Sequence, residues 1–361
     1  MKQKKVATII LFTLPLFIFI LFAAIKLSTY QPKDIEPAPI NNRNHAPLLP
    51  DNSRIKILSW NLQYMAGKKY LFFYDEWDGS GPDKRPSPEE IQKTFKRVVQ
   101  IINDEDPDIL LLQEIDVDSK KTDYDDQLAI LLSMISPEYK SYSSCWYWRA
   151  SFVPHPKIMG KVGLKLAVIS KYKIISSERH QLPVMPGNFI IRNLNFKRAV
   201  LKTEIGLKSG QTLTVMSTHL DAFAQGSDTM QKQVQAVSDL LNNLNNNSKN
   251  WLIAGDFNLI PPGQSYSLLP EDEKQYFQKE TEMELLYNQF HVYPSLNDIQ
   301  GENIYNWFTH FPNRQKAPDR IIDYIITSEN IIPEDYFVRS NDTLDISDHL
   351  PLVMEFTIKS R

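Results

Sequence analysis

The sequence predicts an α/β sandwich, in which helices cover sheets, preceded by one N-terminal transmembrane helix. Residues 6–25 form a long apolar run. After residue 50, short apolar runs typical of strands alternate with patterns typical of helices. The turn sequence at residues 208–211 lies between two of these runs and predicts a hairpin. Hairpins mixed with helical crossovers favour sheets covered by helices over a purely parallel, doubly wound sheet.

The N-terminal run, Val6 to Ile25, is long enough to cross a membrane, since 20 residues at about 1.5 Å each match a hydrocarbon core of about 30 Å. A cleaved signal peptide is the alternative, but it requires an apolar core of only about 7 to 15 residues and an Ala-x-Ala-like site. Ala23 and Ala24 do not complete such a site. Three lysines precede the run and Lys26 and Lys33 follow it, a small asymmetry that favours a cytoplasmic N-terminus. We therefore expect a single-pass membrane anchor, with the rest of the chain on the extracytoplasmic side.

The chain divides into four predicted segments. Residues 1–5 are a basic N-terminus, 6–25 the anchor, 26–50 a tether and 51–361 the globular part. The tether is rich in proline and polar residues, so it would be semi-extended and reach at most about 60 Å at ~3.1 Å per residue. Length alone permits one or two domains in the globular part.

Composition limits the classes of protein that this chain can belong to. The 42% of hydrophobic and 23% of charged residues are typical of a globular chain. A single cysteine, Cys145, excludes internal disulfides and a multi-cysteine zinc site. The first 50 residues hold six of the 40 Lys and Arg side chains but only two of the 43 acidic ones, so the globular part is acidic. A broad basic face for duplex nucleic acid is not expected, because such binding depends on neutralising phosphates.

The elements of the globular part are expected in a defined order. Residues 55–60 form the first strand. Ser87, Pro88 and Glu90 supply an N-cap, a proline at the first helical position and a capping-box glutamate, so a helix begins there and ends before Pro107. Strands then follow at 108–113, 164–170, 198–205, 212–217, 251–254, 321–327 and 350–358, with further helices at 231–244 and 281–290.

Polar side chains gather at the ends of these strands. They are Asn61, Glu114, His219, Asp256, Asn258, Asp323, Asp348 and His349. Burying so many carboxylates, amides and imidazoles among apolar strands is costly unless they meet at a shared partner. A hard cation is the partner that suits this set. Mg²⁺ prefers oxygen ligands and takes only one or two protein carboxylates, so Glu114 with the amide oxygen of Asn61 predicts a magnesium site that a phosphate completes.

The remaining polar side chains predict hydrolysis of a phosphate ester, which needs an activated water and donors to the phosphoryl oxygens. Asp256 is expected to orient or deprotonate water, and Asn258 to bind a non-bridging oxygen. We expect Asp323 to hold His349 and to fix its tautomer. His219 is a second donor.

Six short motifs carry a resemblance. They are SWN at residues 59–61, LLQE at 111–114, STHL at 217–220, GDFN at 255–258, IDYI at 322–325 and SDHLP at 347–351. With these motifs in this order, the sequence resembles the endonuclease/exonuclease/phosphatase superfamily, which includes pancreatic deoxyribonuclease, neutral sphingomyelinases and inositol-polyphosphate 5-phosphatases. Because the motifs extend over nearly all of residues 54–358, the resemblance implies one catalytic domain with a four-layer α/β sandwich.

The resemblance also implies roles for single residues. Metal binding is implied for Asn61, Glu114 and Asp348, and phosphate contact for His219 and Asn258. Water activation is implied for Asp256 and for the pair of Asp323 and His349. The resemblance leaves open whether Asp256 or His349 is the general base.

The resulting hypothesis is a membrane-anchored, Mg²⁺-dependent phosphoesterase, for which Mn²⁺ can substitute. Its substrate would be a phosphodiester or phosphomonoester, with a lipid headgroup as one candidate. A surface or secreted endo- or exonuclease is the alternative, and the acidic globular part does not favour it. A non-catalytic binding module that keeps the fold is a second alternative, against which the intact motifs count.

Two aromatic clusters, at residues 70–77 and 145–148, permit two interpretations. The first is packing in the core. The second is an exposed lip that grips a lipid, since Trp and Tyr suit membrane interfaces.

Overall fold

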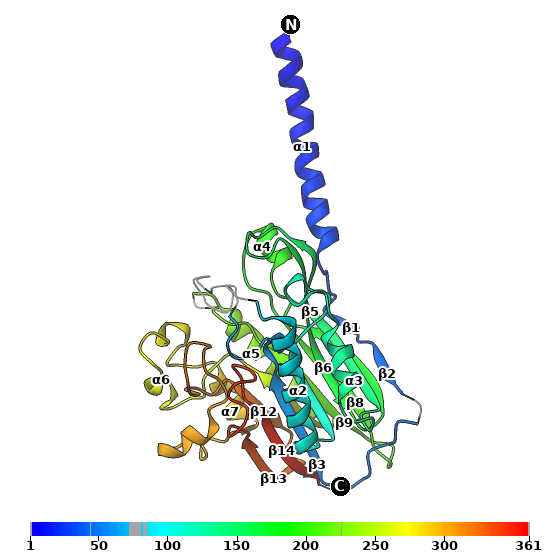
Figure 1. Ribbon diagram of the computed structural model, residues 1–361, viewed down its shortest axis with the longest axis vertical. Coiled ribbons are helices and arrows are strands. Elements are labelled where there is room, and N and C mark those ends of the chain that lie inside the picture. The colour runs from blue at the N-terminus through cyan, green and yellow to red at the C-terminus, as the bar shows by residue number, and fades with distance from the viewer. Residues whose placement is uncertain (1, 44, 72–80, 82–84, 225, 360–361) are drawn as a thin grey trace.

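Two sheets form the centre of the chain, as Figure 1 shows for the computed structural model, which describes residues 2–43, 45–71, 81, 85–224 and 226–359. The first, called the β3 sheet, contains in spatial order β13 (Ile331–Val338), β14 (Leu352–Ile358), β3 (Ile55–Asn61), β4 (Ile109–Asp116), β6 (Gly160–Ser170), β5 (Ser141–Val153) and β2 (Ile40–Asn42). The second, called the β9 sheet, contains β1 (Ile35–Pro37), β7 (Ile174–Gln181), β8 (Ala199–Gly206), β9 (Thr212–His219), β10 (Asn250–Asp256), β12 (Asp323–Thr327) and β11 (His291–Tyr293).

Helices cover the outer face of each sheet. Side chains of α2 (Pro88–Glu105) and α3 (Gln127–Met134) share one buried cluster with the β3 sheet, and those of α5 (Thr229–Asn246) and α7 (Met283–Gln289) share another with the β9 sheet. A third cluster joins the two sheets face to face. The order is therefore helix, sheet, sheet, helix, which is the four-layer arrangement that the resemblance implied.

Burial on both faces explains why β4 appears in the sequence as a continuous apolar run. Leu110 and Leu112 face the helices, whereas Ile109 and Leu111 face the other sheet. A strand covered on both sides needs apolar side chains at every position rather than at alternate ones.

Local signals in the sequence agree with the structure where they are strong. Ser87 caps α2 with the predicted capping box, in which the Ser87 side chain accepts from the backbone of Glu90 and the Glu90 side chain accepts from that of Ser87. The predicted turn joins β8 to β9, which pair antiparallel from Gly206 and Thr212 onward. The long strand β5 was not predicted, because its aromatic residues 145–148 show no alternation. Tyr147 and Trp148 are buried in the core, so this cluster is not an exposed lip, while Phe72, Phe73, Tyr74 and Trp77 lie outside the described residues.

Helix α1 (Lys2–Ser28) contains the predicted membrane span, residues 6–25. The side chains of residues 2–12, 14 and 17 are outside the description. In the part of the chain that the structure describes, no helix reaches the length and apolar character that crossing a membrane requires.

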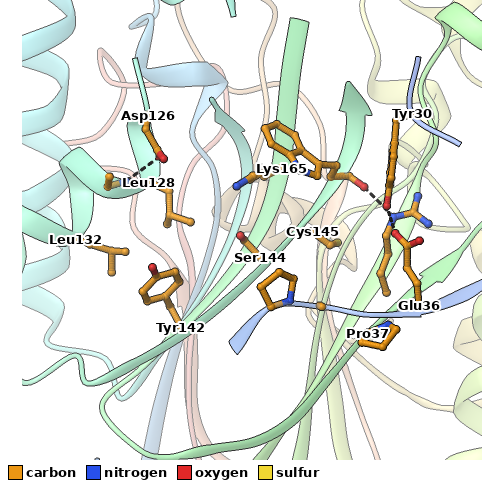
Figure 2. A pocket seen from close by; sticks show the side chains of 15 residues that line it. Tyr30, Glu36, Pro37, Asp126, Leu128, Leu132, Tyr142, Ser144, Cys145 and Lys165 are labelled. Carbon is orange, nitrogen blue, oxygen red and sulfur yellow. Dashed lines mark hydrogen bonds between the residues drawn. The ribbon is translucent and has the colours of Figure 1, made fainter. Parts of the chain in front are cut away.

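The predicted semi-extended tether was residues 26–50. In the structure residues 29–50, which we call the strap, pair with both sheets. Its strand β1 extends the β9 sheet at β7, and β2 extends the β3 sheet at β5. In Figure 2, Tyr30, Glu36 and Pro37 of the strap line the same pocket as Cys145, and the Tyr30 hydroxyl donates to the Glu36 carboxylate. A short, extended segment can satisfy the open edge of a sheet, which explains the pairing. Because the strap is bound to both sheets, it does not have the reach of about 60 Å that was expected for an unbound segment of this length.

Candidate active site

The ends of four strands meet at one edge of the sandwich. β3 runs parallel to β4 in one sheet, and β9 runs parallel to β10 in the other, so each pair brings its carboxyl ends together. Asn61 ends β3, His219 ends β9 and Asp256 ends β10. Asp323 begins β12 directly opposite Asp256 in the antiparallel ladder. The sandwich therefore collects predicted site residues from both sheets.

Asp256 lies at the centre of the cluster and is buried. Its Oδ2 accepts a hydrogen bond from Asn61 Nδ2 at 3.1 Å, and lies 3.3 Å from His219 Nε2 and 3.5 Å from His349 Nε2. Its Oδ1 accepts from the backbone N–H of Asn258 at 2.9 Å. Both carboxylate oxygens are thus fixed in position.

His349 is held by Asp323, as predicted from the sequence, with 2.8 Å between His349 Nδ1 and Asp323 Oδ2. Burial opposes a charge on the ring, but the carboxylates of Asp323 and Asp256 outweigh it and raise the pKa of His349 to about 10. Burial also raises the pKa of Asp256, with Asp323 adding to the shift and His349 opposing it. The ring of His349 therefore keeps a proton at neutral pH, while Asp256 is a stronger proton acceptor than an ordinary aspartate.

Glu114 and Asp348 add two further carboxylates. A bulge between Leu112 and Ile115 of β4 turns Glu114 out of the ladder, and its φ is 57°. Bulges re-aim side chains, and such backbone strain is found at functional sites. Burial, reinforced by the charge of Asp348, raises the pKa of Glu114, and burial also raises the pKa of Asp348. Two like charges that resist ionisation side by side favour a cation between them.

A cavity of about 270 Å³ joins these groups. Six of the eight predicted residues line it, namely Glu114, His219, Asp256, Asn258, Asp348 and His349. Asn61 and Asp323 do not line it, but they contact Asp256 and His349 from behind. Asn258 has a φ of 52°, and its side chain donates to the carbonyl oxygen of Leu220 at 3.1 Å.

The donor set fits a hard divalent cation. Carboxylates and an amide oxygen are the ligands that Mg²⁺ and Mn²⁺ prefer. Within the described residues, His219 Nδ1 is buried without a hydrogen-bond partner, 3.9 Å from Glu114 Oε1. The amide oxygen of Asn61 accepts from the backbone N–H of Gln63 at 3.1 Å, so a cation would compete with that hydrogen bond. Among residues that the structure describes, His, Asp and Glu donor atoms come close enough to share one ion in two groups. These are His310 with Asp348 and His349, and Asp256 with Asp323 and His349.

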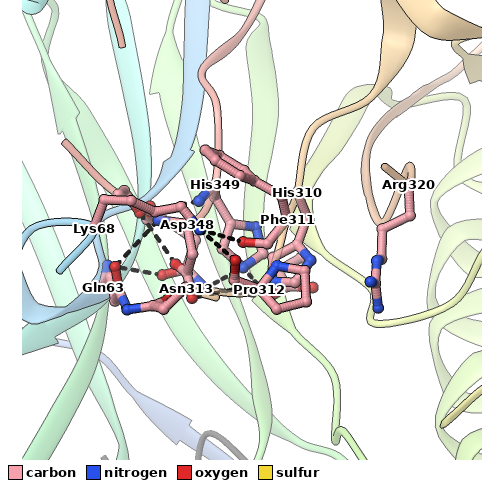
Figure 3. Close-up of polar contacts among 12 residues, drawn as sticks. Gln63, Lys68, His310, Phe311, Pro312, Asn313, Arg320, Asp348 and His349 are labelled. Atoms are coloured by element: carbon pink, nitrogen blue, oxygen red, sulfur yellow. Dashed lines mark hydrogen bonds and ion pairs between the residues drawn. The ribbon is translucent and has the colours of Figure 1, made fainter. Parts of the chain in front are cut away.

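The segment after β3 fixes the loop that carries Asp348. The backbone N–H of Asp348 donates to Gln63 Oε1 at 3.1 Å, and Gln63 Nε2 donates to Asn313 Oδ1 at 3.0 Å. Lys68 Nζ donates to the carbonyl oxygen of Phe311 at 3.0 Å, and its pKa falls to about 8 because it is buried. Figure 3 shows these side chains converging below His349 and His310. The residues after Asn61 therefore support the site, although nothing in their pattern indicated this.

Arg198 is a cavity residue that sequence reasoning missed. It is buried, and its Nε donates to Asp221 Oδ1 at 3.1 Å. Among the described residues, Arg198 Nη1 has no hydrogen-bond partner. Asp221 also accepts from Gln233 Nε2 at 2.8 Å. The sequence held a signal for this pair, because Arg198 directly precedes β8 and Asp221 follows the motif that contains His219. In the described part of the chain, this guanidinium is the one positively charged side chain other than histidine that lines the cavity.

His310 was also missed. Its ring centroid lies 4.5 Å from that of His349, and its Nε2 lies 4.0 Å from Asp348 Oδ2. Burial, together with the charge of His349, holds its pKa well below the ordinary value, so this ring is neutral and available as a nitrogen donor. No motif marked it, since it stands in an aromatic run at residues 307–311.

The structure explains why the GDFN motif begins with a glycine, Gly255. Its φ is +149°, and a Cβ there would lie 2.0 Å from the carbonyl oxygen of Thr218 on β9. Only glycine allows β10 to approach β9 this closely, immediately before Asp256.

Comparison with known proteins gives one family match. The sequence model of the Endonuclease/Exonuclease/phosphatase family matches residues 58–349, which include all eight predicted site residues. No curated protein sequence matches the chain significantly.

Solved structures share the fold. An endonuclease/exonuclease/phosphatase from Beutenbergia cavernae superposes with a TM-score of 0.58 at 19% identity, over 85% of this chain and 72% of that one. A family protein from Leptotrichia buccalis gives 0.53 at 15% identity, over 84% and 100%. The human Nocturnin catalytic domain with bound sulfate gives 0.52 at 17% identity, over 89% and 98%. At these identities the likeness concerns the fold.

Proposed function

The chain belongs to the Endonuclease/Exonuclease/phosphatase family, whose members are metal-dependent phosphoester hydrolases, and from this premise we propose a membrane-anchored, Mg²⁺-dependent phosphoesterase. Its proposed substrates are phosphodiesters or phosphomonoesters at a membrane surface, with lipid headgroups first among them. The observation that carries the proposal is the cavity in which Glu114, Asp256, Asp348 and His349 meet.

The charge pattern of the cavity supports phosphate chemistry. Three carboxylates whose pKa values are raised by burial favour a cation beside them, and Arg198 Nη1, which has no hydrogen-bond partner among the described residues, is offered to an anion. Glu114, Asp348 and Asn61 are the residues proposed to hold Mg²⁺ or Mn²⁺. A divalent cation bound there would neutralise charge on the phosphoryl oxygens and orient the substrate.

Proton transfer is assigned to the chain's own residues. Asp256, with its raised pKa, is the proposed base that takes a proton from the attacking water. His349 keeps its proton at neutral pH and is the proposed acid for the leaving oxygen. Asp323 acts through His349 by fixing its ring and stabilising its charge. Asn258 and His219 are proposed to bind non-bridging oxygens of the phosphate.

Membrane anchoring is the second half of the proposal. It rests on the apolar sequence from Val6 to Ile25 and on the three lysines that precede it. With the N-terminus in the cytoplasm, the globular part lies on the extracytoplasmic side. Anchoring raises the effective concentration of substrates in the same membrane without any new contact, which favours a lipid phosphoester over a freely diffusing polymer.

A surface nuclease is the second candidate function. The guanidinium of Arg198 in the cavity would serve a nucleic acid phosphate equally well. The acidic globular part disfavours it, because nucleic acid binding rests on many cations.

The test uses the full-length protein in phosphatidylcholine vesicles. Hydrolysis of a chromogenic phosphodiester, a chromogenic phosphomonoester, vesicle phospholipid, and single- and double-stranded DNA is measured with Mg²⁺ and with excess chelator. We expect Mg²⁺-dependent hydrolysis of the chromogenic ester and of the lipid, lost in Glu114→Gln and kept in Glu302→Gln, whose side chain is exposed.

Three outcomes contradict parts of the proposal. Full activity in excess chelator would remove the metal assignment. Cleavage of DNA with untouched lipid would replace the lipid function with the nuclease. Absence of hydrolysis on every substrate would leave a binding module that retains the fold.

A further inference from the structure

Helix α4 (Phe189–Leu194) exposes apolar side chains to the surface. It contains no buried residue, and Phe189, Ile190 and Ile191 are 38%, 42% and 50% exposed. Three consecutive large apolar side chains on a surface cost free energy unless something apolar covers them. The helix stands in the connection between β7 and β8, which also carries Arg198 into the catalytic cavity.

Contact with helix α1 fixes the position of α4 along the predicted membrane span. Figure 1 shows α4 beside the lower end of α1, and the rings of Phe22 and Phe189 lie 4.6 Å apart. Phe22 stands three residues before Ile25, the last residue of the span. At about 1.5 Å per residue this is about 4.5 Å inside the span. Interfacial helices bury their apolar face by about 5 to 10 Å, so the contact with Phe22 sets α4 just short of the shallow limit of that depth.

Hydrogen bonds fix the residues directly after α1 to the globular part. The backbone N–H of Tyr30 donates to the carbonyl oxygen of Arg149 at 2.9 Å, and Gln31 Nε2 donates to Asn193 Oδ1 of α4 at 2.9 Å. The strap then continues along both sheet edges. A domain held in this way has a fixed orientation relative to α1. The depth of α4 in a membrane would therefore follow from the depth of α1.

The charge around α4 suits an anionic headgroup. A cavity of about 380 Å³ beside the helix is lined by Arg192 and Lys197 together with Gln31 and Asn193, and none of the carboxylates that the structure describes lines it. Lys26 at the end of α1 is exposed. Cations close to a bilayer surface attract anionic lipids.

We propose that α4 and the cavity beside it form a bilayer-docking surface, in which Phe189, Ile190 and Ile191 enter the headgroup region while Arg192 and Lys197 receive the headgroup of an anionic phospholipid. The docking surface rests on the anchoring part of the proposed function. The occupant is the bilayer that α1 enters, because α1 and α4 are in direct contact.

Docking would turn the catalytic cavity toward the membrane. Met185, Asn195 and Phe196 of the same connection line that cavity. β14 begins beside the site and runs to the C-terminus, which Figure 1 shows at the end of the molecule opposite α1. The site therefore lies at the α1 end of the strands, on the same side of the sandwich as the proposed docking surface.

The test places an environment-sensitive fluorophore on an Ile190→Cys variant of the full-length protein. Cys145 does not compete for the label, because it is buried and burial raises its pKa to about 12. The matched control is Ile332→Cys on β13, where an isoleucine of similar exposure, 43%, stands in the strand paired with the C-terminal part of β14. Both variants are reconstituted into phosphatidylcholine vesicles with and without phosphatidylglycerol, and brominated lipids serve as quenchers.

We expect both variants to float with the vesicles, with a blue-shifted and strongly quenched probe on Ile190→Cys and an unquenched probe on Ile332→Cys. Adding phosphatidylglycerol should deepen the quenching, and Arg192→Gln should remove that increase. Floating protein with an unquenched probe on Ile190→Cys would overturn the docking surface and leave the anchor intact. Protein that does not float would overturn the anchor and, with it, the docking surface, whereas Mg²⁺-dependent hydrolysis of the chromogenic ester would still support the phosphoesterase.

Discussion

Replacing Asp323 by asparagine tests how the site holds the proton of His349. The two side chains are 2.8 Å apart and almost fully buried, while the next carboxylate, that of Asp256, lies 3.5 Å from the other ring nitrogen. Together with burial, these groups move the pKa of His349 from 6.5 to about 10. At about 1.4 kcal/mol per pH unit, this corresponds to roughly 5 kcal/mol in favour of the charged ring. Because Asp323 is the nearer carboxylate, we expect Asp323→Asn to lower the pKa of His349 by roughly 1 to 3 units.

The assay is the pH dependence of kcat on a soluble phosphodiester at saturating Mg²⁺. A raised pKa keeps the acid form of His349 present through neutral pH, and activity falls as the pH rises through that pKa. In Asp323→Asn the fall should move to lower pH by the same roughly 1 to 3 units, so kcat should drop most above neutral pH, where the unmodified protein still keeps the proton on His349. KM should change little, since Asp323 does not line the cavity. An NMR titration of the His349 ring reports the same shift without turnover.

The control is Asp319→Asn, in which the lost carboxylate binds the guanidinium of Arg320 at 2.6 and 2.9 Å rather than His349. Its alkaline limb should match that of the unmodified protein. An Asp323→Asn profile with an unmoved alkaline limb would refute the proton-holding role. So would fully additive losses in the double variant Asp323→Ala/His349→Ala, because two residues that act as one unit do not lose activity independently.

Three further predictions concern metal binding and stability. Glu114→Gln should weaken Mg²⁺ binding by roughly 10- to 100-fold in calorimetry while the circular dichroism spectrum stays unchanged; unchanged affinity would contradict its assignment as a ligand. Gly255→Ala should lower the free energy of unfolding by at least about 1 to 3 kcal/mol in denaturant titration, because its Cβ would lie 2.0 Å from the carbonyl oxygen of Thr218. Asp221→Asn should lower the free energy of unfolding by about 3 to 5 kcal/mol, because it leaves the buried guanidinium of Arg198 uncompensated. A melting temperature equal to that of the unmodified protein would count against a buried ion pair.

Much of the fold is encoded in local patterns. The capping box at Ser87, the hairpin turn before β9 and the apolar run of β4 each reflect the dihedral preferences, or the burial, of neighbouring residues. These signals act over a few residues, so they survive in a sequence without its tertiary contacts. The strap escaped prediction because its strands are three residues long and are stabilised only by edges that distant strands supply.

The sequence by itself determined which side chains stand at strand ends, because an apolar run that stops at Asn61 or Asp256 is visible without the fold. Only the tertiary structure decided which of them meet. Asp256 contacts Asn61 and His349 across two sheets because the sandwich packs those sheets face to face. The same packing brings Arg198 and His310 into the cavity and sets α4 beside α1. Such contacts join residues far apart in the chain, and their geometry depends on how whole layers pack, which no local pattern specifies.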